Sequence, residues 1–224
     1  MAVINVKGDI IPNDYKKYYD FFEWEGTCPK DVSDVLESAG EDEAIDVFIN
    51  SPGGIVQAGQ EIYTALRSNP NVSIHIVGEA CSAASFIAMA GKSDITPVGL
   101  MMVHCAATVA DGNHKDFEQA AQMLRTVDSA IAQAYADKSG MTVEDAVKLM
   151  EDETWLNAKQ CVEYGLIDSI MTDTEAPVQQ IAAAAGRIQL TPEMIERADK
   201  EIAQRAALED AKTQLLESLD SFGA

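Results

Sequence analysis

The sequence predicts an α/β fold in which parallel strands alternate with crossover helices. Short apolar or alternating runs, typical of strands, are separated by amphipathic runs of helical period. Connections of helix length between successive strands are what a parallel sheet requires. The composition fits a sizeable folded core, with 47% hydrophobic and 24% charged residues in a chain of 224.

In the first half of the chain, strand and helix patterns alternate regularly. One helix shows the pattern clearly, because Pro29 stands near its first position, Val32, Val35 and Leu36 share a face, and Gly40 follows its end. The predicted strands here are Val3–Ile10, Ile45–Asn50 and Val72–Val77, and the predicted helices are Pro29–Ser38, Gln57–Arg67 and a buried helix over residues 82–91.

The second half is predicted to be mainly helical. A short strand at Gly99–His104 precedes helices at Lys115–Lys138, Thr142–Met150 and Asn157–Tyr164, and residues 166–171 are strand-like.

The composition changes after Thr174, and we expect a domain over residues 1–174 followed by a linker and tail over 175–224. An Ala/Gln-rich connector leads to Thr191 and Pro192, which suit the N-cap and first position of a last, acidic helix. Apolar residues at nearly heptad spacing indicate a packing face, so the tail is expected to pack on a neighbouring subunit or to be flexible. These residues are Ile195, Ile202, Leu208, Leu215 and Leu219.

Charge and composition exclude several classes of partner. Thirty-seven acidic against 16 basic residues give a net charge of −21, which would repel nucleic acid and anionic membranes. No apolar run approaches the roughly 20 residues that span a bilayer, and no secretory signal is visible at the start. The scattered cysteines form no CxxC pair, which argues against zinc and against a disulfide scaffold. We therefore expect a cytoplasmic protein without metal or organic cofactor.

The first chemical motif is INSPGGIVQAG, residues 49–59, where a buried strand runs through Ser-Pro-Gly-Gly into a helix. Paired glycines let backbone N–H groups turn outward, and a nearby helix N-terminus adds positive potential. This arrangement is typical of a backbone oxyanion hole, although Gly-Gly alone is more often a plain turn.

The second motif, GEACSAASFIAMAG over residues 78–91, places one of two serines at a similar junction. Ser82 is expected at the start of the buried helix, where a developing anion is favoured. Ser85 lies almost one turn inside, where its hydroxyl is expected to bond back to an earlier carbonyl. The N–H of Ala83 at the helix start could then be a second oxyanion donor beside Gly54.

A nucleophilic serine needs a base, and three histidines are available. His75 alternates within a strand and His114 lies in a polar stretch, so both are read as structural or surface residues. His104 ends an apolar strand where a loop begins, the usual position of a catalytic residue in an α/β fold. A carboxylate should orient it, and Glu151, Asp152 and Glu153 are equally placed by spacing alone.

Together these motifs resemble the proteolytic subunit of the caseinolytic (Clp) protease family. The resemblance covers residues 3–171 through INSPGG, GEACSAAS…AMAG, MMVH and W-L-x-A-x-x-x-x-E-Y-G-L-I-D, all in the family's order. It implies a spiral of parallel strands and crossover helices, also found in crotonases, with a protruding handle helix (Lys115–Lys138). It also implies a ring oligomer with protein or peptide substrates.

The resemblance assigns roles to individual residues. The nucleophile falls on Ser82, where Cys81 replaces the usual preceding Ala, and the base falls on His104. The acid position of the family, usually aspartate, falls on Glu153, with Asp152 as the alternative. The oxyanion donors fall on the backbones of Gly54 and Ala83.

Within the family the chain looks most like phage head-maturation (prohead) proteases. It starts almost at the first core strand, and His104 is followed by Cys-Ala instead of the usual Gln-Pro. These departures favour a stand-alone protease in the host cytoplasm or procapsid over a subunit driven by an ATPase. Other hypotheses are a crotonase-like acyl-CoA enzyme, a Ser-Lys peptidase using Lys92 or Lys138, and an inactive assembly protein.

Overall fold

Eight strands form one sheet in the computed structural model, which describes residues 1–172 and 190–222, with side chains to residue 214. All strand pairs are parallel except β6 with β7. The order is β2-β1-β3-β4-β5-β8, and β6 lies beside β4 and β7. The strands are β1 (Ala2–Ile10), β2 (Gly26–Thr27), β3 (Ile45–Gly54), β4 (Val72–Cys81), β5 (Lys92–Ile95), β6 (Leu100–Val103), β7 (Thr154–Asn157) and β8 (Ser169–Ile170).

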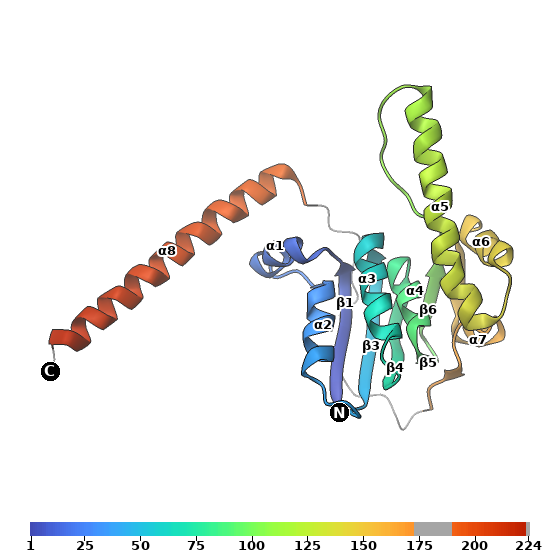
Figure 1. Cartoon of the computed structure of the whole chain (residues 1–224), viewed down its shortest axis with the longest axis horizontal. Helices are drawn as coiled ribbons and strands as arrows, with labels where there is room; N and C mark the ends of the chain where they lie inside the picture. The colour runs from blue at the N-terminus through green and yellow to red at the C-terminus, as the bar shows by residue number, and fades with distance from the viewer. Residues whose placement is uncertain (173–189, 223–224) are drawn as a thin grey trace. The chain divides into compact units, whose positions relative to one another are not determined.

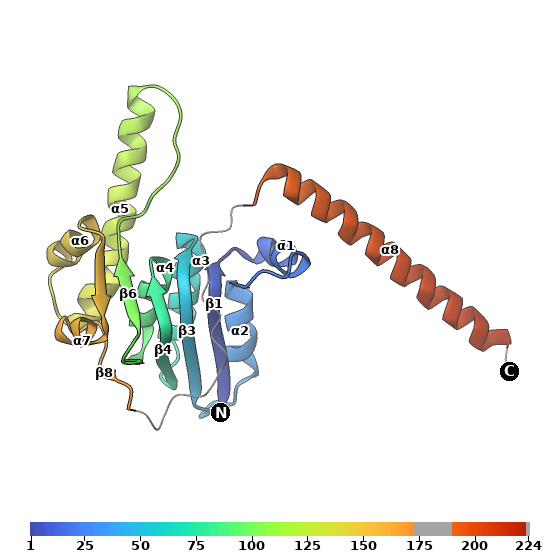
Figure 2. The same ribbon diagram turned by 180° about the vertical axis from the view of Figure 1, so that it is seen from behind.

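Helices connect all successive strands except β5 and β6, so the predicted α/β class is confirmed. Figure 1 shows α2, α3 and α4 together on one face of the sheet, and Figure 2 shows the strands from the other side. The predicted buried helix over residues 82–91 is divided into α4 and a 3-10 turn, η2. The helices are η1 (Asn13–Tyr15), α1 (Lys16–Phe21), α2 (Pro29–Ser38), α3 (Val56–Arg67), α4 (Ala83–Ile87), η2 (Ala88–Ala90), α5 (His114–Ser139), α6 (Val143–Glu151), α7 (Ala158–Glu163) and α8 (Pro192–Phe222).

The core lies between the central strands and the helices that cover them. Val47 and Ile49 of β3, and Ile74 and Ile76 of β4, are fully buried. Each such side chain contributes about 1.5–3 kcal/mol by leaving water. Ile62 of α3 packs in the same buried cluster from the helical side of the sheet. The near-continuous apolar runs of β3 and β4 are therefore those of strands buried inside a parallel sheet.

Strand β4 changes partners along its length, and this change positions the site. Its first part pairs with β5 from Ser73 to Ile76, whereas its last part pairs with β6 from Glu79 to Cys81. Between them the backbone N–H of Glu79 donates to the Asn50 side chain at 3.1 Å, and a Cβ on Gly78 would run into that amide. Glycine is therefore required where β4 departs from β5 and approaches β6.

Helix α5 is the longest helix of the sheet-containing part of the chain, and its N-terminal half projects beyond the sheet (Figure 1). A capping box starts it, in which Asn113 accepts from the N–H of Lys115 at 2.8 Å and Asp116 accepts from Asn113. Gly140, with a φ of 79°, ends it in the left-handed conformation that glycine favours. In the described part of the chain, every helix is too short or too polar to cross a lipid bilayer.

The chain divides into two compact units, Met1–Lys16 with Glu25–Arg187, and Lys17–Trp24 with Ile188–Ala224. The predicted boundary at residue 174 and the Ala/Gln-rich connector lie outside the described residues. In the second unit, Asp199 of α8 accepts from Lys17 at 2.7 Å and from the Tyr18 hydroxyl at 3.1 Å. Thr191 caps α8 as predicted, by accepting from the N–H of Met194 at 3.3 Å.

His75 is held between two carboxylates in the sheet. Its Nδ1 lies 2.7 Å from Asp94 of β5 and its Nε2 lies 3.5 Å from Asp46 of β3, while its ring stacks on Phe48. The hydrogen bond to Asp94, reinforced by Asp46 and opposed by burial, raises the pKa of His75 above 6.5. His75 thus links β3, β4 and β5 through its ring, and its carboxylate neighbours favour the protonated form.

This arrangement makes part of the stability depend on pH. Because the pKa is raised on folding, the contribution of His75 is complete below its unfolded pKa and disappears as pH rises through the folded value. Replacing His75 by Gln should therefore reduce the free energy of unfolding more at about pH 5.5 than at about pH 8.5. Urea unfolding at the two pH values measures this difference. Asp94→Asn should weaken the pH dependence, and a His75→Gln effect that is the same at both pH values would contradict the assignment.

Candidate active site

Ser82 occupies the sharp turn between β4 and α4. Its φ of 53° and ψ of −121° are values that residues other than glycine rarely adopt. Such a conformation costs about 1–3 kcal/mol and is retained only where its surroundings fix it. The small residues Ala80, Cys81 and Ala83 beside it leave room for the turn. The turn leaves the serine half-buried at the end of the strand.

Three hydrogen bonds fix this turn. The N–H of Ser82 donates to the carbonyl of Met102 on β6 at 2.9 Å. The carbonyl of Ser82 accepts from both the N–H of Ser85 at 3.0 Å and its hydroxyl at 2.6 Å. The predicted bond from the Ser85 hydroxyl to an earlier carbonyl is therefore confirmed. Ser85 is fully buried, so it stabilises the turn from inside the helix.

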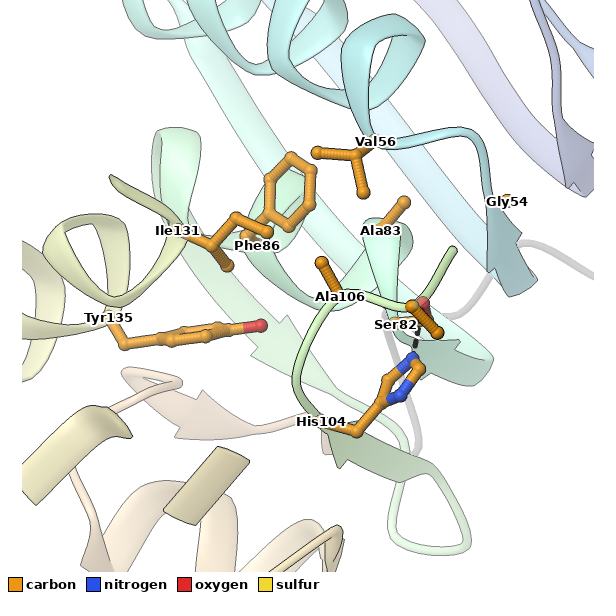
Figure 3. Close-up of a pocket in the computed structure, with 10 residues that line it drawn as sticks. Gly54, Val56, Ser82, Ala83, Phe86, His104, Ala106, Ile131 and Tyr135 are labelled. Atoms are coloured by element: carbon orange, nitrogen blue, oxygen red, sulfur yellow. Dashed lines mark hydrogen bonds between the residues drawn. The ribbon is translucent and has the colours of Figure 1, made fainter. Parts of the chain in front are cut away.

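His104 lies within hydrogen-bond distance of Ser82. Its Nε2 is 2.7 Å from the Ser82 Oγ (Figure 3). Strand pairing causes this contact, because Cys81 is paired with Met102, and Ser82 and His104 are the residues directly after β4 and β6. When Nε2 accepts the serine proton, Nδ1 must carry the other imidazole proton. The pair then has the orientation of a nucleophile with its base.

The Ser-Pro-Gly-Gly turn lies directly against the Ser82 turn. A Cβ on Gly53, whose φ is 95°, would come within 2.5 Å of the Cys81 carbonyl oxygen and 2.6 Å of the Ser82 Cβ. The buried Ser51 hydroxyl holds the turn in place, since it donates to the Gly8 carbonyl at 2.6 Å and accepts from the N–H of Gly53 at 3.1 Å. Sequence analysis did not assign this role to Ser51, although its place in the motif is a usable signal.

Gly54 and Ala83 line the same cavity as Ser82 and His104. Ala83 is the first residue of α4, so its N–H has no acceptor within the helix. Gly54 ends β3 opposite Ile10 of β1. The structure thus brings four of the predicted site residues to one place.

The remaining wall of the cavity is apolar. It encloses about 50 Å3 beside Ser82 and is lined there by Val56, Phe86, Ala106, Ala107, Ile131 and Tyr135 (Figure 3). Sequence analysis did not identify the two α5 residues in this wall. Their spacing of four, which places Ile131 and Tyr135 on one helix face, was the available signal. The cavity is suited to a small apolar group next to the serine.

The acidic residues lie at the end of α6, outside this cavity. Asp152 caps the helix, and Glu153 follows with a φ of 47°; both are exposed. Val103 of β6 is paired with Thr154 of β7 in antiparallel register. The observed pairing ends there, and continuing it by one residue would bring Glu153 opposite His104 and leave Asp152 one residue further away.

The other histidine and lysine candidates do not line the cavity beside Ser82. His114 is exposed at the start of α5. Lys138 donates to the Gly91 carbonyl at 2.9 Å and to Asp168 at 2.6 Å, whereas Lys92 is exposed on β5. Burial, together with the Glu79 carboxylate, raises the pKa of the Cys81 thiol to about 12. Cys81 is therefore a neutral thiol beside the serine at physiological pH.

The sheet and the Ser82–His104 contact define an α/β protein with a hydrolase-type serine–histidine pair. A family model described as Clp protease matches residues 34–174, which is more than half of the chain. The chain therefore belongs to the Clp protease family. Membership implies peptidase activity, and proteins of this family typically bind protein substrates and form rings.

The backbone strain at Ser82 predicts that a glycine variant is more stable than an alanine variant. Ser82→Ala and Ser82→Gly both remove the hydroxyl, but only glycine adopts the observed φ and ψ without strain. Ser82→Gly should therefore be more stable than Ser82→Ala by about 1 kcal/mol, or roughly 2–4 °C in melting temperature. Calorimetry of the two variants measures the difference. A less stable Ser82→Gly variant would contradict the strained turn.

Proposed function

We propose that the protein is a serine endopeptidase whose nucleophile is Ser82 and whose general base is His104. The observation that carries the proposal is the 2.7 Å contact between Oγ and Nε2 at a strained strand-to-helix turn. Such a contact allows the base to take the serine proton as the bond to substrate forms. Membership in a protease family indicates that the bond cleaved is a peptide bond.

The reaction proceeds through an acyl-enzyme. Ser82 Oγ bonds to the peptide carbonyl carbon while its proton passes to His104, and the carbonyl electron pair becomes an oxyanion. The N–H groups of Gly54 and Ala83 hold this oxyanion. Collapse breaks the C–N bond, and His104 gives the proton to the leaving amine. Water then attacks the carbonyl carbon of the ester while His104 takes a proton from it. Collapse breaks the bond to Ser82 Oγ, releases the carboxylic acid product, and returns the proton from His104 to Ser82.

Glu153 is proposed as the carboxylate that orients His104. The β6–β7 register supports it over Asp152, because continuing the pairing by one residue beyond Val103 and Thr154 would bring Glu153, and not Asp152, opposite His104. Its backbone supports it as well, since Glu153 adopts a left-handed conformation after α6 where glycine is favoured. A glutamate in a backbone conformation that glycine would adopt without strain favours a requirement for its side chain.

The biological role proposed is maturation of phage procapsids by cleavage of scaffold and capsid precursors, inside the host cytoplasm. Support comes from the Glu-Thr-Trp-Leu form around the acid, which resembles the phage branch of the family, and from Cys-Ala after His104, which departs from the Gln-Pro of the housekeeping enzymes. A ring oligomer is part of this proposal. The alternative within the family is a bacterial subunit that needs an ATPase.

Labelling with a fluorophosphonate tests the nucleophile and the base. Wild type should be modified at Ser82, Ser85→Ala should still be labelled at Ser82, and Ser82→Ala should not be labelled. His104→Ala should lose at least 100-fold in rate, because a general base contributes about 10²–10⁴. Mass spectrometry of the adduct locates the modified residue.

Labelling that persists in Ser82→Ala would reject the assignment. An unreactive wild type that binds acyl-CoA would support the crotonase-like alternative, and one that binds neither reagent would support an inactive assembly protein. Hydrolysis of an unfolded protein substrate without ATP or an ATPase would separate a stand-alone protease from an ATPase-driven one.

The acid is tested with three variants. Glu153→Gln should lower kcat by at least 10-fold, whereas Asp152→Asn should have little effect, because only Glu153 is placed to orient His104. Glu153→Gly should lose activity equally while gaining about 1 kcal/mol of stability from relief of the left-handed backbone. Peptide hydrolysis and thermal unfolding measure the two effects. The reverse ranking of Glu153→Gln and Asp152→Asn would move the role to Asp152.

A further inference from the structure

Helix α5 makes hydrogen bonds near both members of the serine–histidine pair, to the backbone of Ala106 and to the hydroxyl of Ser85. Its contacts come from Asp128 and Tyr135, which lie seven residues apart and therefore on one face of the helix. Both are buried, with exposed fractions of 8% and 3%. The two side chains belong to the same helix face but reach different segments of the site.

Asp128 reaches the segment that follows His104. Its Oδ1 accepts from the N–H of Ala106 at 2.7 Å, two residues beyond the histidine. A carboxylate acceptor makes this hydrogen bond stronger than one between neutral groups. A buried carboxylate also needs such donors, because it is otherwise costly to remove from water. Asp128 thus fixes where the chain leaves β6 after His104.

Tyr135 reaches the Ser82 turn through Ser85. The tyrosine hydroxyl lies 2.7 Å from the Ser85 Oγ, which lies 2.6 Å from the Ser82 carbonyl oxygen. The single hydroxyl proton of Ser85 points to that carbonyl, so Tyr135 must be the donor to Ser85. Burial raises the pKa of Tyr135, which keeps this donor protonated. The resulting order is Tyr135, then Ser85, then the backbone of Ser82.

We propose that Asp128 and Tyr135 are positioning residues that set the distance between Ser82 and His104 through α5. This inference rests on the proposed function, because it assigns roles toward that same pair. A rigid helix that holds both segments fixes the nucleophile relative to its base. Neither side chain needs to touch the reacting atoms, and a displacement of either segment by about 1 Å can cost about 100-fold in rate.

The test compares labelling by a small fluorophosphonate, peptide kcat and KM, and thermal unfolding in the full chain. Asp128→Ala and Tyr135→Phe should slow labelling by about 10-fold to 100-fold while unfolding stays cooperative. In Asp128→Ala the loss should lie in kcat and not in KM. Asp128→Asn keeps an oxygen acceptor for Ala106 and should recover most of the rate. Asp137→Ala, which removes an exposed carboxylate from the same helix, is the matched control.

A double variant tests the order of contacts. Because Tyr135 acts through Ser85, Ser85→Ala combined with Tyr135→Phe should be no slower than the slower single variant. Wild-type labelling at Ser82 together with unchanged rates in Asp128→Ala and Tyr135→Phe would overturn this inference alone. Equal loss in Asp128→Asn and Asp128→Ala would assign the effect to charge and overturn the acceptor role. Absence of labelling in wild type would overturn the proposed function and this inference with it.

Discussion

The turn at Ser82 is the constraint around which the site is built. An L-amino acid is held there in a conformation that favours glycine, and the strain is tolerated because hydrogen bonds to Met102 and Ser85 fix both sides of the residue. The same crowding explains why Gly53 cannot carry a side chain. The small residues around Ser82 are thus a consequence of close backbone approach.

Parallel pairing brings the reactive groups to one edge of the sheet. Strands β3, β4 and β6 end side by side, so the Ser-Pro-Gly-Gly residues that end β3 lie near Ser82 and His104, which directly follow β4 and β6. The change of partner within β4 is essential, since pairing with β5 alone would leave β6 and its histidine elsewhere. Helix α5 then contacts both the serine turn and the segment after His104.

Much of this could be predicted from local sequence. The helix Pro29–Ser38 was placed at its observed bounds, because its capping and apolar signals are strong. The central strands continue further than predicted, since SPGG and GEAC remain in the ladder although they lack apolar alternation. Strands β5 and β7 were not predicted, because KSDI and TWLN lack the continuous apolar run that marks β6, LMMV, at the same length of four residues.

The site also contains residues that local sequence could identify and residues that it could not. Ser82 and His104 could be selected because each follows a strand, which is a local property. The choice between Glu153 and Asp152 depends on the register of β6 with β7, which sequence spacing does not contain. The contacts of Asp128 and Tyr135 join residues 22 and 50 positions apart. Such pairs are determined by helix placement in the folded chain.

A crystal structure of the protein after phosphonylation tests the central claim most directly. The account predicts a covalent bond from Ser82 Oγ to phosphorus, with the phosphoryl oxygen about 2.7–3.1 Å from the backbone nitrogens of both Gly54 and Ala83. The strained Ser82 backbone and the nearby His104 should be retained. A phosphoryl oxygen directed away from both nitrogens, or an adduct on another residue, would contradict the account.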